Sequence, residues 1–262
     1  MAERLATDFA FSHSSAALLH GCWTWRLGPA VHVTQSGVPK AGRRADPLLR
    51  RHCSALPPDS RTTVAGLPVT SLERTVVDSA CELDEEQAIV IADSALRLGA
   101  DPDLIVSMTD ARAGYRGIRR ARRVLALADG DSESPGETLT RCTVVQAGLP
   151  TPRVQIDIHT GRGTLWVDLG WDDIKVGIEF DGVGKYGADG RDARADILAE
   201  KKRDGVLDGL GWTIVHVVWA DLADRDALVA RVRGAIGLGT RRTLLTQGSV
   251  PARWLPGASR VA

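Results

Sequence analysis

The sequence has no surplus of charge of either sign, because 33 lysines and arginines balance 33 aspartates and glutamates. A chain without net charge creates no global electrostatic field, so its composition indicates neither a nucleic-acid nor a membrane partner. Any such partner must be inferred from local patches. Apolar residues make up 44% and charged residues 25% of the chain, which excludes wholesale disorder, a collagen-like repeat and a coiled coil.

Cysteines are few and isolated, and they form no Cys-x-x-Cys pair that would indicate a zinc site or a redox motif. Long apolar runs are also lacking, and none approaches the ~20 residues needed to span a bilayer. The first ten residues contain Glu3 and Asp8 and lack the cationic start and apolar stretch of a signal peptide. We therefore expect a soluble cytoplasmic protein with reduced thiols and no membrane partner.

The length of 262 residues favours two domains. Turn formers and solvated acids dominate the segment 129–136, which separates two stretches of helical periodicity. We place the boundary there and expect domains at 1–128 and 129–240, followed by a basic tail at 241–262.

The first half combines short extended segments with helices and predicts a small α+β domain. Thr70 and Glu73 have the spacing of a capping box, in which a hydroxyl and a glutamate satisfy each other's free backbone amides. The expected elements are a helix at 16–19, a strand at 30–34, extended chain at 61–69, and helices from 70, at 85–98 and at 112–123.

The second half predicts an α/β domain with the order α-β-β-β-α-β-α. Residues 153–159 alternate strictly between apolar and polar, as a half-buried strand does. The expected elements are helices at 136–147, 192–210 and 221–236 and strands at 153–159, 164–171, 174–181 and 212–218.

Carboxylates gather on two of these strands. The apolar neighbours of Asp168 share one face of their strand, so we expect Asp168 on the other. The same alternation sets Glu179 and Asp181 together on one face of the next strand. Acids packed closely are costly unless a cation neutralises them, and Mg²⁺ is commonly held by one or two carboxylates. The pattern favours a divalent metal site, to which Glu137 adds a further acid; solvated or salt-bridged strand ends are the alternative.

Two motifs extend this pattern, Glu179-Phe-Asp-Gly-Val-Gly-Lys-Tyr186 and Glu200-Lys-Lys-Arg-Asp204. With Asp168 and Glu137 they resemble the Vsr-like group of PD-(D/E)XK nucleases over about residues 131–235. The resemblance implies a mixed central sheet in an α-β-β-β-α-β domain, and metal-dependent hydrolysis of DNA phosphodiester bonds. It implies Asp168 and Glu179 as principal ligands of Mg²⁺ or Mn²⁺, with Asp181 and Glu137 as further ligands.

The chain departs from the family's named motif at one position. The lysine expected two residues after Glu179 is Asp181. The missing cation must then come from Lys185 on the following loop or Lys201 on the following helix. If neither reaches the metal, the domain binds DNA without cutting it.

A second resemblance lies in the first half, over about residues 10–100. The chain there resembles the C-terminal part of AbiEi-type antitoxins, DNA-binding partners in type IV toxin-antitoxin systems. A winged helix usually precedes this region in that family, and we expect none before residue 10. The motifs that carry the resemblance are Ser12-His-Ser-Ser-Ala-Ala17, Gly66-Leu-Pro-Val-Thr70, Glu73-Arg-Thr-Val-Val-Asp78 and Ala92-Asp-Ser-Ala-Leu-Arg97.

Cationic and imidazole side chains supply the remaining candidates. The stretch 112–123 contains six arginines and no acid, and predicts either a phosphate-gripping face or a solvated amphipathic helix. His13 and His20, seven residues apart, could share a helix face as a metal or catalytic pair, with a structural role as the alternative. The predicted DNA contacts are Arg116, Arg119, Arg120, Arg123, Lys202 and Arg203, with the arginines of the acid-free segment 227–262 as a further arm.

Two hypotheses about function follow. The leading one is a metal-dependent DNA endonuclease of the Vsr-like type. The alternative is a non-catalytic DNA-binding regulator or antitoxin-like protein with a degenerate nuclease fold. DNA is the expected partner in both, and a homodimer and a toxin partner protein stay open.

Overall fold

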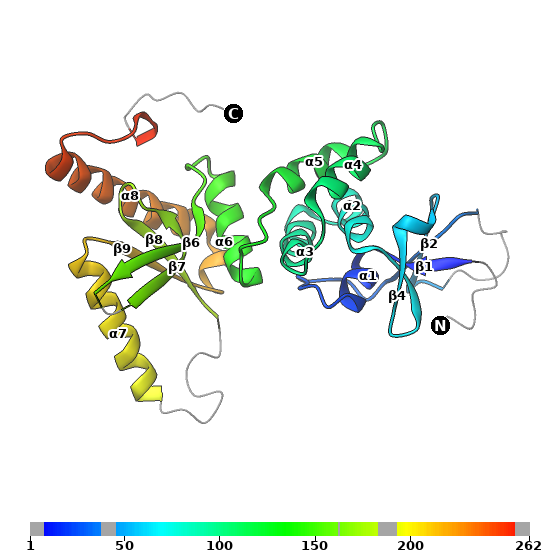
Figure 1. Cartoon of the computed structure of the whole chain (residues 1–262), viewed down its shortest axis with the longest axis horizontal. Coiled ribbons are helices and arrows are strands. Elements are labelled where there is room, and N and C mark those ends of the chain that lie inside the picture. The colour runs from blue at the N-terminus through cyan, green and yellow to red at the C-terminus, as the bar shows by residue number, and fades with distance from the viewer. Residues whose placement is uncertain (1–7, 38–45, 162, 183–192, 255–262) are drawn as a thin grey trace. The chain divides into compact units, whose positions relative to one another are not determined.

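A computed structural model describes residues 8–37, 46–161, 163–182 and 193–254. The chain divides into two compact units, Met1–Asp131 and Ser132–Ala262, and each has its own mixed sheet with its own helices (Figure 1). The predicted α/β fold class is confirmed.

The N-terminal unit contains a five-stranded sheet in the order β3-β2-β1-β5-β4. β1 pairs antiparallel with β2 and parallel with β5, while β3 runs parallel to β2 at one edge. β4 and β5 form a hairpin within the stretch predicted as continuous extended chain. The strands are β1 Phe9–Phe11, β2 Val31–Gln35, β3 Leu49–Cys53, β4 Arg61–Val64 and β5 Leu67–Thr70.

Within the described residues of this unit there are five α-helices, and α2 is central because it contacts α1, α3, α4 and α5. The cap of α2 differs from the prediction: Ser71, not Thr70, accepts the amide of Arg74. The predicted helix 112–123 is also corrected, because a turn with glycine in a left-handed conformation at Gly117 delays the start of α5. The helices are α1 His13–Leu19, α2 Leu72–Glu82, α3 Glu85–Arg97, α4 Pro102–Asp110 and α5 Ile118–Leu127; the 3₁₀ helix η2 covers Pro58–Ser60.

The C-terminal unit has the predicted order α-β-β-β-α-β-α. Its sheet has the order β6-β7-β8-β9, in which the first three strands are antiparallel and β9 runs parallel to β8. The parallel pair requires a crossover, and α7 supplies it. The elements are α6 Pro135–Gln146, β6 Arg153–Thr160, β7 Gly163–Trp171, β8 Val176–Asp181, α7 Ala193–Gly209, β9 Thr213–Val218 and α8 Arg225–Gln247, with 3₁₀ helices η3 Asp221–Ala223 and η4 Ala252–Trp254.

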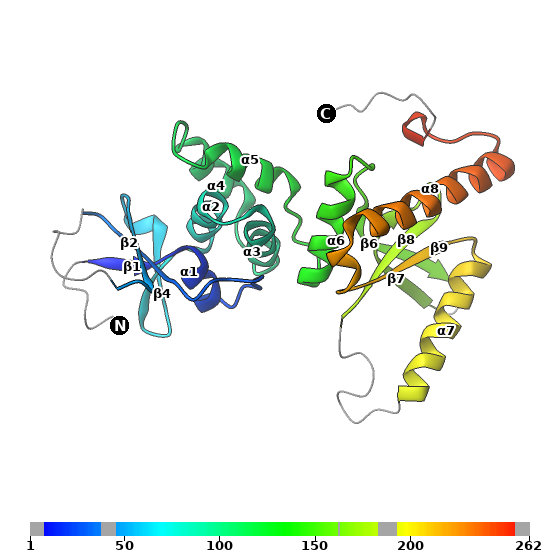
Figure 2. The same cartoon turned by 180° about the vertical axis from the view of Figure 1, so that it is seen from behind.

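The sheet of this unit is covered on both faces, with α7 and α8 on opposite sides of it (Figures 1 and 2). One core joins the strands to α6 and α8, and the other joins them to Leu207 of α7. On β9 the alternation is regular, since Ile214 faces the α7 core and Val215 faces the other. The polar residues that share the α7 face are therefore enclosed between a sheet and a helix.

The last helix extends beyond its predicted end. α8 continues to Gln247, so residues 241–247 of the predicted tail are helical. Gly239 lets this extension lie against the chain that enters β8, because a Cβ there would lie 2.5 Å from the Ile174 carbonyl oxygen. Among the residues that the structure describes, no helix combines the length and apolar character needed to cross a membrane.

Candidate functional site: a polar row across the C-terminal sheet

Three polar residues lie side by side on neighbouring strands of the C-terminal sheet. Two of them were predicted as site residues, and the third was not. β7 and β8 pair with Leu169 opposite Ile178, and one further step of this register sets Asp168 opposite Glu179. β8 and β9 pair with Glu179 beside His216. Asp168, Glu179 and His216 therefore form a transverse row on three adjacent strands.

Asp168 does not follow the simple alternation expected of it. Val167 packs in the core beneath α7, whereas Leu169 packs in the core beneath α6 and α8, so the two neighbours do not share a face. The neighbouring strand β6 contains Gln155 in a left-handed conformation, with φ 48°. This residue interrupts the regular alternation of side chains on β6 and on β7, which pairs with it. The Asp168 carboxylate instead accepts the backbone amide of Phe180 at 2.8 Å.

Glu179 is buried, with 2% of its surface exposed. Its Oε2 accepts a hydrogen bond from the Arg203 guanidinium at 2.5 Å, and Arg203 also donates to the Trp166 carbonyl. Within the described residues its Oε1 has no hydrogen-bond partner. Burial raises the pKa of the Glu179 carboxyl; Arg203 opposes this rise, and the charge of Asp168 adds to it.

Glu137 has a structural task at the start of α6. Its two oxygens accept the amide of Glu133 and the hydroxyl of Ser134, while its own amide donates to that hydroxyl. The Ser134 hydroxyl and the Glu137 carboxylate therefore cap the first turn of α6, and the carboxylate also holds the residue before the N-cap. Gln155 donates to the same carboxylate at 3.3 Å. Burial raises the pKa of Glu137, and the nearby charge of Asp168 contributes.

Asp181 lies at the end of β8 beside His216, whose Nδ1 is 3.1 Å from an Asp181 oxygen. On its other side the His216 Nε2 lies 3.4 Å from Asp204 of α7. Glu179, Asp204 and His216 bring one ligand atom each within 4.8 Å of one another, and so do Asp181, Glu200 and His216. No local motif marks His216 as a site residue, because only the pairing of β9 with β8 brings it beside Glu179 and Asp181.

The cation at this site is Arg203, which was expected to contact DNA. Lys201 and Lys202 are exposed on α7, and Lys185 lies outside the described residues. Neither predicted replacement for the motif lysine therefore accounts for the positive charge beside Glu179 in the part of the chain that the structure describes.

The arginines of the N-terminal unit that were predicted to contact DNA are of two kinds, those with partners in the protein and those that are exposed. Arg120 donates to the carbonyls of Ala80 and Cys81, and Arg123 pairs with Glu85. Arg116 and Arg119 are exposed, and nothing in the described chain pairs with them. In the basic segment after residue 227, the arginines that contact acids or carbonyls of their own unit are Arg231, Arg233, Arg242 and Arg253.

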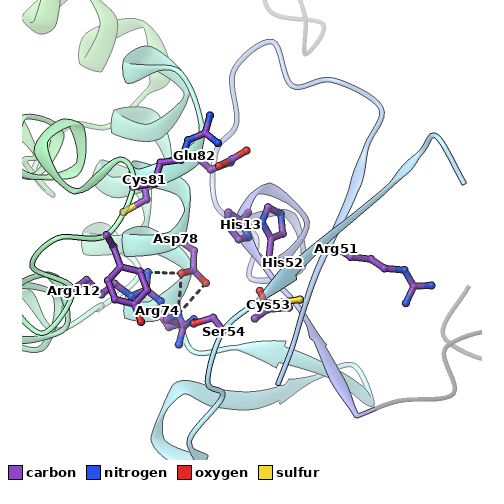
Figure 3. A pocket seen from close by; sticks show the side chains of 13 residues that line it. His13, Arg51, His52, Cys53, Ser54, Arg74, Asp78, Cys81, Glu82 and Arg112 are labelled. Carbon is purple, nitrogen blue, oxygen red and sulfur yellow. Dashed lines mark hydrogen bonds and ion pairs between the residues drawn. The ribbon is translucent and has the colours of Figure 1, made fainter. Parts of the chain in front are cut away.

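A second site is a pocket of about 360 Å³ in the N-terminal unit (Figure 3). At its base Asp78 accepts hydrogen bonds from Arg74 at 2.9 Å and Arg112 at 2.6 Å. Burial disfavours the Asp78 charge, but the surrounding positive groups outweigh burial and keep its pKa below the ordinary value. The side chains of His13 and His52 lie together on another wall of the pocket.

The histidine pair predicted from spacing is not the pair that the fold assembles. His20 contacts the Thr70 carbonyl at 2.8 Å, which is a structural role. His13 instead joins His32 and His52, and one ring nitrogen of each lies within 4.8 Å of the others. Burial lowers the pKa of His13 to about 3 and that of His32 to about 4, so both rings are neutral near pH 7.

The N-terminal unit is similar to a known protein family. Residues 9–127 match the family model of the AbiEi antitoxin C-terminal domain. The N-terminal part of the chain is therefore antitoxin-like. This confirms the AbiEi resemblance, while the Vsr-like nuclease resemblance of the second half stays a prediction.

Two uncharacterised proteins of Mycobacterium tuberculosis, from strains CDC 1551 and H37Rv, are each 33% identical to the chain over 172 residues. The alignments cover 64% of this chain and 62% of each relative, so the chain spans less than two thirds of these relatives. The search of solved structures found no match.

Proposed function

We propose that this chain is an antitoxin-like, DNA-binding regulator of the cytoplasm, whose C-terminal unit uses a nuclease-like architecture for binding. The observation that carries the proposal is the match of residues 9–127 to the AbiEi antitoxin C-terminal domain. The partner classes that this match favours are DNA and a toxin protein, and a homodimer is compatible with both.

The geometry of the C-terminal unit supports binding over hydrolysis. All four carboxylates expected to hold a metal have partners within the protein. Arg203 pairs with Glu179, and the Phe180 amide donates to Asp168. The Ser134 hydroxyl donates to Glu137, and His216 contacts Asp181. These partners stabilise the carboxylates without a metal ion.

Exposed cations provide a surface for phosphates. Arg116 and Arg119 of the N-terminal unit are exposed, whereas Arg123 beside them pairs with Glu85. Cations that already face a carboxylate contribute less to phosphate binding, because that pair must first be broken. We therefore assign DNA contact in this unit to Arg116 and Arg119.

A titration with labelled duplex DNA at several salt concentrations tests this assignment. Each phosphate contact contributes about −0.9 to the slope of log affinity against log salt, because a bound phosphate releases counterions. The double variant Arg116→Gln, Arg119→Gln should reduce the slope by roughly 2 and weaken binding. The matched control, Arg122→Gln with Arg123→Gln, removes two cations that pair with Asp110 and Glu85 and should change the slope less.

Binding that ignores salt, or an equal effect of both double variants, would contradict the assignment. The antitoxin role is tested separately, by co-expressing the full chain with a type IV toxin. Growth should recover in the presence of the chain, and continued arrest would count against an antitoxin role.

A metal-dependent nuclease is the second candidate, and one observation favours it. The Oε1 of Glu179 and the Oδ1 of Asp204 are buried without hydrogen bonds in the described chain. Orphaned carboxylate oxygens beside His216 suit a divalent ion, and Mg²⁺ or Mn²⁺ bound there would lower the pKa of a water and stabilise phosphate charge. Glu179 and Asp204 would hold the ion together with His216; in the resemblance, Asp168 and Asp181 would contribute.

Incubation of the purified chain with plasmid, single-stranded and branched DNA in Mg²⁺, Mn²⁺ or EDTA separates the two candidates. A regulator binds DNA in all conditions and leaves it intact. A nuclease cuts only with metal and loses cleavage by orders of magnitude in Asp168→Asn or Glu179→Gln, while DNA binding without metal persists. Cleavage that survives Asp168→Asn comes from another site or a contaminant.

A further inference from the structure

The structure assigns a binding site for a Zn²⁺-class transition-metal ion to His13, His32 and His52 of the N-terminal unit. The three residues come from α1, β2 and β3, and one ring nitrogen of each lies within 4.8 Å of the other two. Three imidazole nitrogens with an open fourth position are a ligand set used by catalytic zinc sites. This inference is independent of the proposed function.

The sheet brings the three rings together. β2 and β3 run parallel with Thr34 opposite His52, so His32, two residues before Thr34, projects from the same face as His52. The His32 Nδ1 lies 3.0 Å from the His52 Nε2. From the start of α1, His13 stacks on His52 with ring centroids 3.8 Å apart.

The backbone of His13 is held in an uncommon conformation. Its φ is 53°, in the left-handed region that side chains with a Cβ rarely adopt. Such strain costs on the order of 1–3 kcal/mol and persists where the surrounding structure holds the residue in place. Here it lies at the first residue of α1 and accompanies the placement of the ring against His52.

A polar chain sets the orientation of His13. Thr34 donates to the Ser12 hydroxyl at 2.8 Å, and the His13 Nδ1 lies 2.9 Å from the same oxygen. This contact occupies Nδ1 and leaves Nε2 for a metal. Metal-binding histidines usually make such a second hydrogen bond, which orients the ring.

The cluster is accessible to ions from the pocket. His13 and His52 line the pocket, so a bound ion would have a route to solvent and to a fourth ligand there (Figure 3). Glu82 on the pocket rim supplies a negative charge that would partly offset that of the ion.

The test uses the full chain carrying His216→Asn, which removes both candidate metal groups of the C-terminal unit. Zn²⁺ is titrated against a chromophoric chelator, and Co²⁺ is titrated with its visible absorption as the readout. We expect one equivalent bound and a Co²⁺ spectrum typical of nitrogen ligation. His32→Asn and His52→Asn should each lose more affinity than the roughly 10–100-fold that changes outside the ligand shell cause.

Two variants serve as graded controls. Ser12→Ala keeps all three imidazoles but removes the contact that orients His13, so it should lose roughly 10–100-fold. His20→Asn removes a histidine of the same unit that lies outside the cluster, and its affinity should match that of the His216→Asn parent. Circular dichroism of each metal-free variant checks that it folds.

The site is refuted if the His216→Asn parent binds no Zn²⁺ and gives no Co²⁺ absorption. It is equally refuted if His20→Asn loses as much affinity as His52→Asn. Should a cluster variant fail to fold, the ligands can be identified from the Co²⁺ spectrum and from histidine NMR shifts of the Zn²⁺-bound parent. Those shifts must move for His13, His32 and His52 and stay constant for His20.

Discussion

Buried Glu179 of β8 and partly exposed Arg203 of α7 form an ion pair, with an Arg203 nitrogen 2.5 Å from the Glu179 Oε2. The pair joins the crossover helix to the sheet at the position where the resemblance to nucleases implies a metal. A guanidinium at this position does two things at once. It neutralises the carboxylate, and it anchors α7 through a second hydrogen bond to the Trp166 carbonyl.

Loss of this pair should destabilise the C-terminal unit in a pH-dependent manner. Arg203→Met leaves Glu179 buried without its cation and should cost about 3 kcal/mol at pH 7.5, the lower end for a buried pair because Arg203 is partly exposed. The pKa of Glu179 is already raised by burial, and it rises further when Arg203 is removed. At pH 5 more of the folded chains therefore hold a neutral Glu179, and the cost should shrink.

Urea unfolding at pH 7.5 and pH 5, followed by circular dichroism, measures this difference. Lys202→Met is the matched control, since it removes a neighbouring exposed cation of the same helix and should change stability little at either pH. An equal loss at both pH values for Arg203→Met would mean that packing and the Trp166 contact, rather than the charge of Glu179, account for the effect.

The buried network around Asp78 in the N-terminal pocket should contribute more to folding stability than the Glu179–Arg203 pair does. Asp78→Asn removes the only charge that both Arg74 and Arg112 contact among the described residues. Both guanidinium groups then stay largely buried without a counter-ion, which costs about 3–5 kcal/mol. Thermal unfolding measures the loss, and Asp110→Asn, which breaks an exposed pair with Arg122, should change little. Similar midpoints for the two variants would contradict a structural role for Asp78.

The order of the C-terminal elements could be predicted because local patterns determine it. Strict alternation marks β6, and apolar residues at every second position of β8 place Glu179 and Asp181 on the opposite face, beneath α7. These patterns depend on side chains two residues apart. They need no knowledge of how distant segments pair.

The composition of the polar row could not be predicted, because register and backbone irregularity determine it. His216 joins Glu179 only through the parallel pairing of β8 and β9, and Asp204 only through the packing of α7. The left-handed conformation of Gln155 breaks the alternation around Asp168, and no local sequence motif predicts this conformation. The spacing of seven residues likewise suggests His20 as the partner of His13. The fold instead joins His13 to His32 and His52, which lie on strands distant in the sequence.

Thiol labelling provides a further check on the fold of the N-terminal unit. Burial raises the pKa of Cys22 to about 11, whereas Cys53 is exposed on the edge strand β3. The thiolate is the reactive form, so at pH 8 iodoacetamide should label Cys53 well before Cys22. Raising the pH to about 9 should still leave Cys22 protected, because its thiol stays largely protonated below its shifted pKa. Peptide mass spectrometry measures the order, and equal rates for the two residues in the native chain would contradict the buried position of Cys22.

Two glycines of α8 test whether the helix packs along its full length. A Cβ at Gly239 would lie 2.5 Å from the Ile174 carbonyl oxygen and 2.6 Å from Val176, whereas a Cβ at Gly234 would meet nothing within 4 Å. Gly239→Ala should therefore cost about 1–3 kcal/mol through overpacking against backbone. Gly234→Ala should stabilise the helix by about 0.5–1 kcal/mol, since alanine loses less conformational entropy.

Because both substitutions add the same methyl group to the same helix, helix propensity cancels between them, and the difference in unfolding free energy reports contact with Ile174. The measurement is urea unfolding of each variant beside the parent chain. If Gly239→Ala is as stabilising as Gly234→Ala, the last two turns of α8 do not pack on the sheet, and the basic segment from residue 241 is a separate arm, as its composition first suggested.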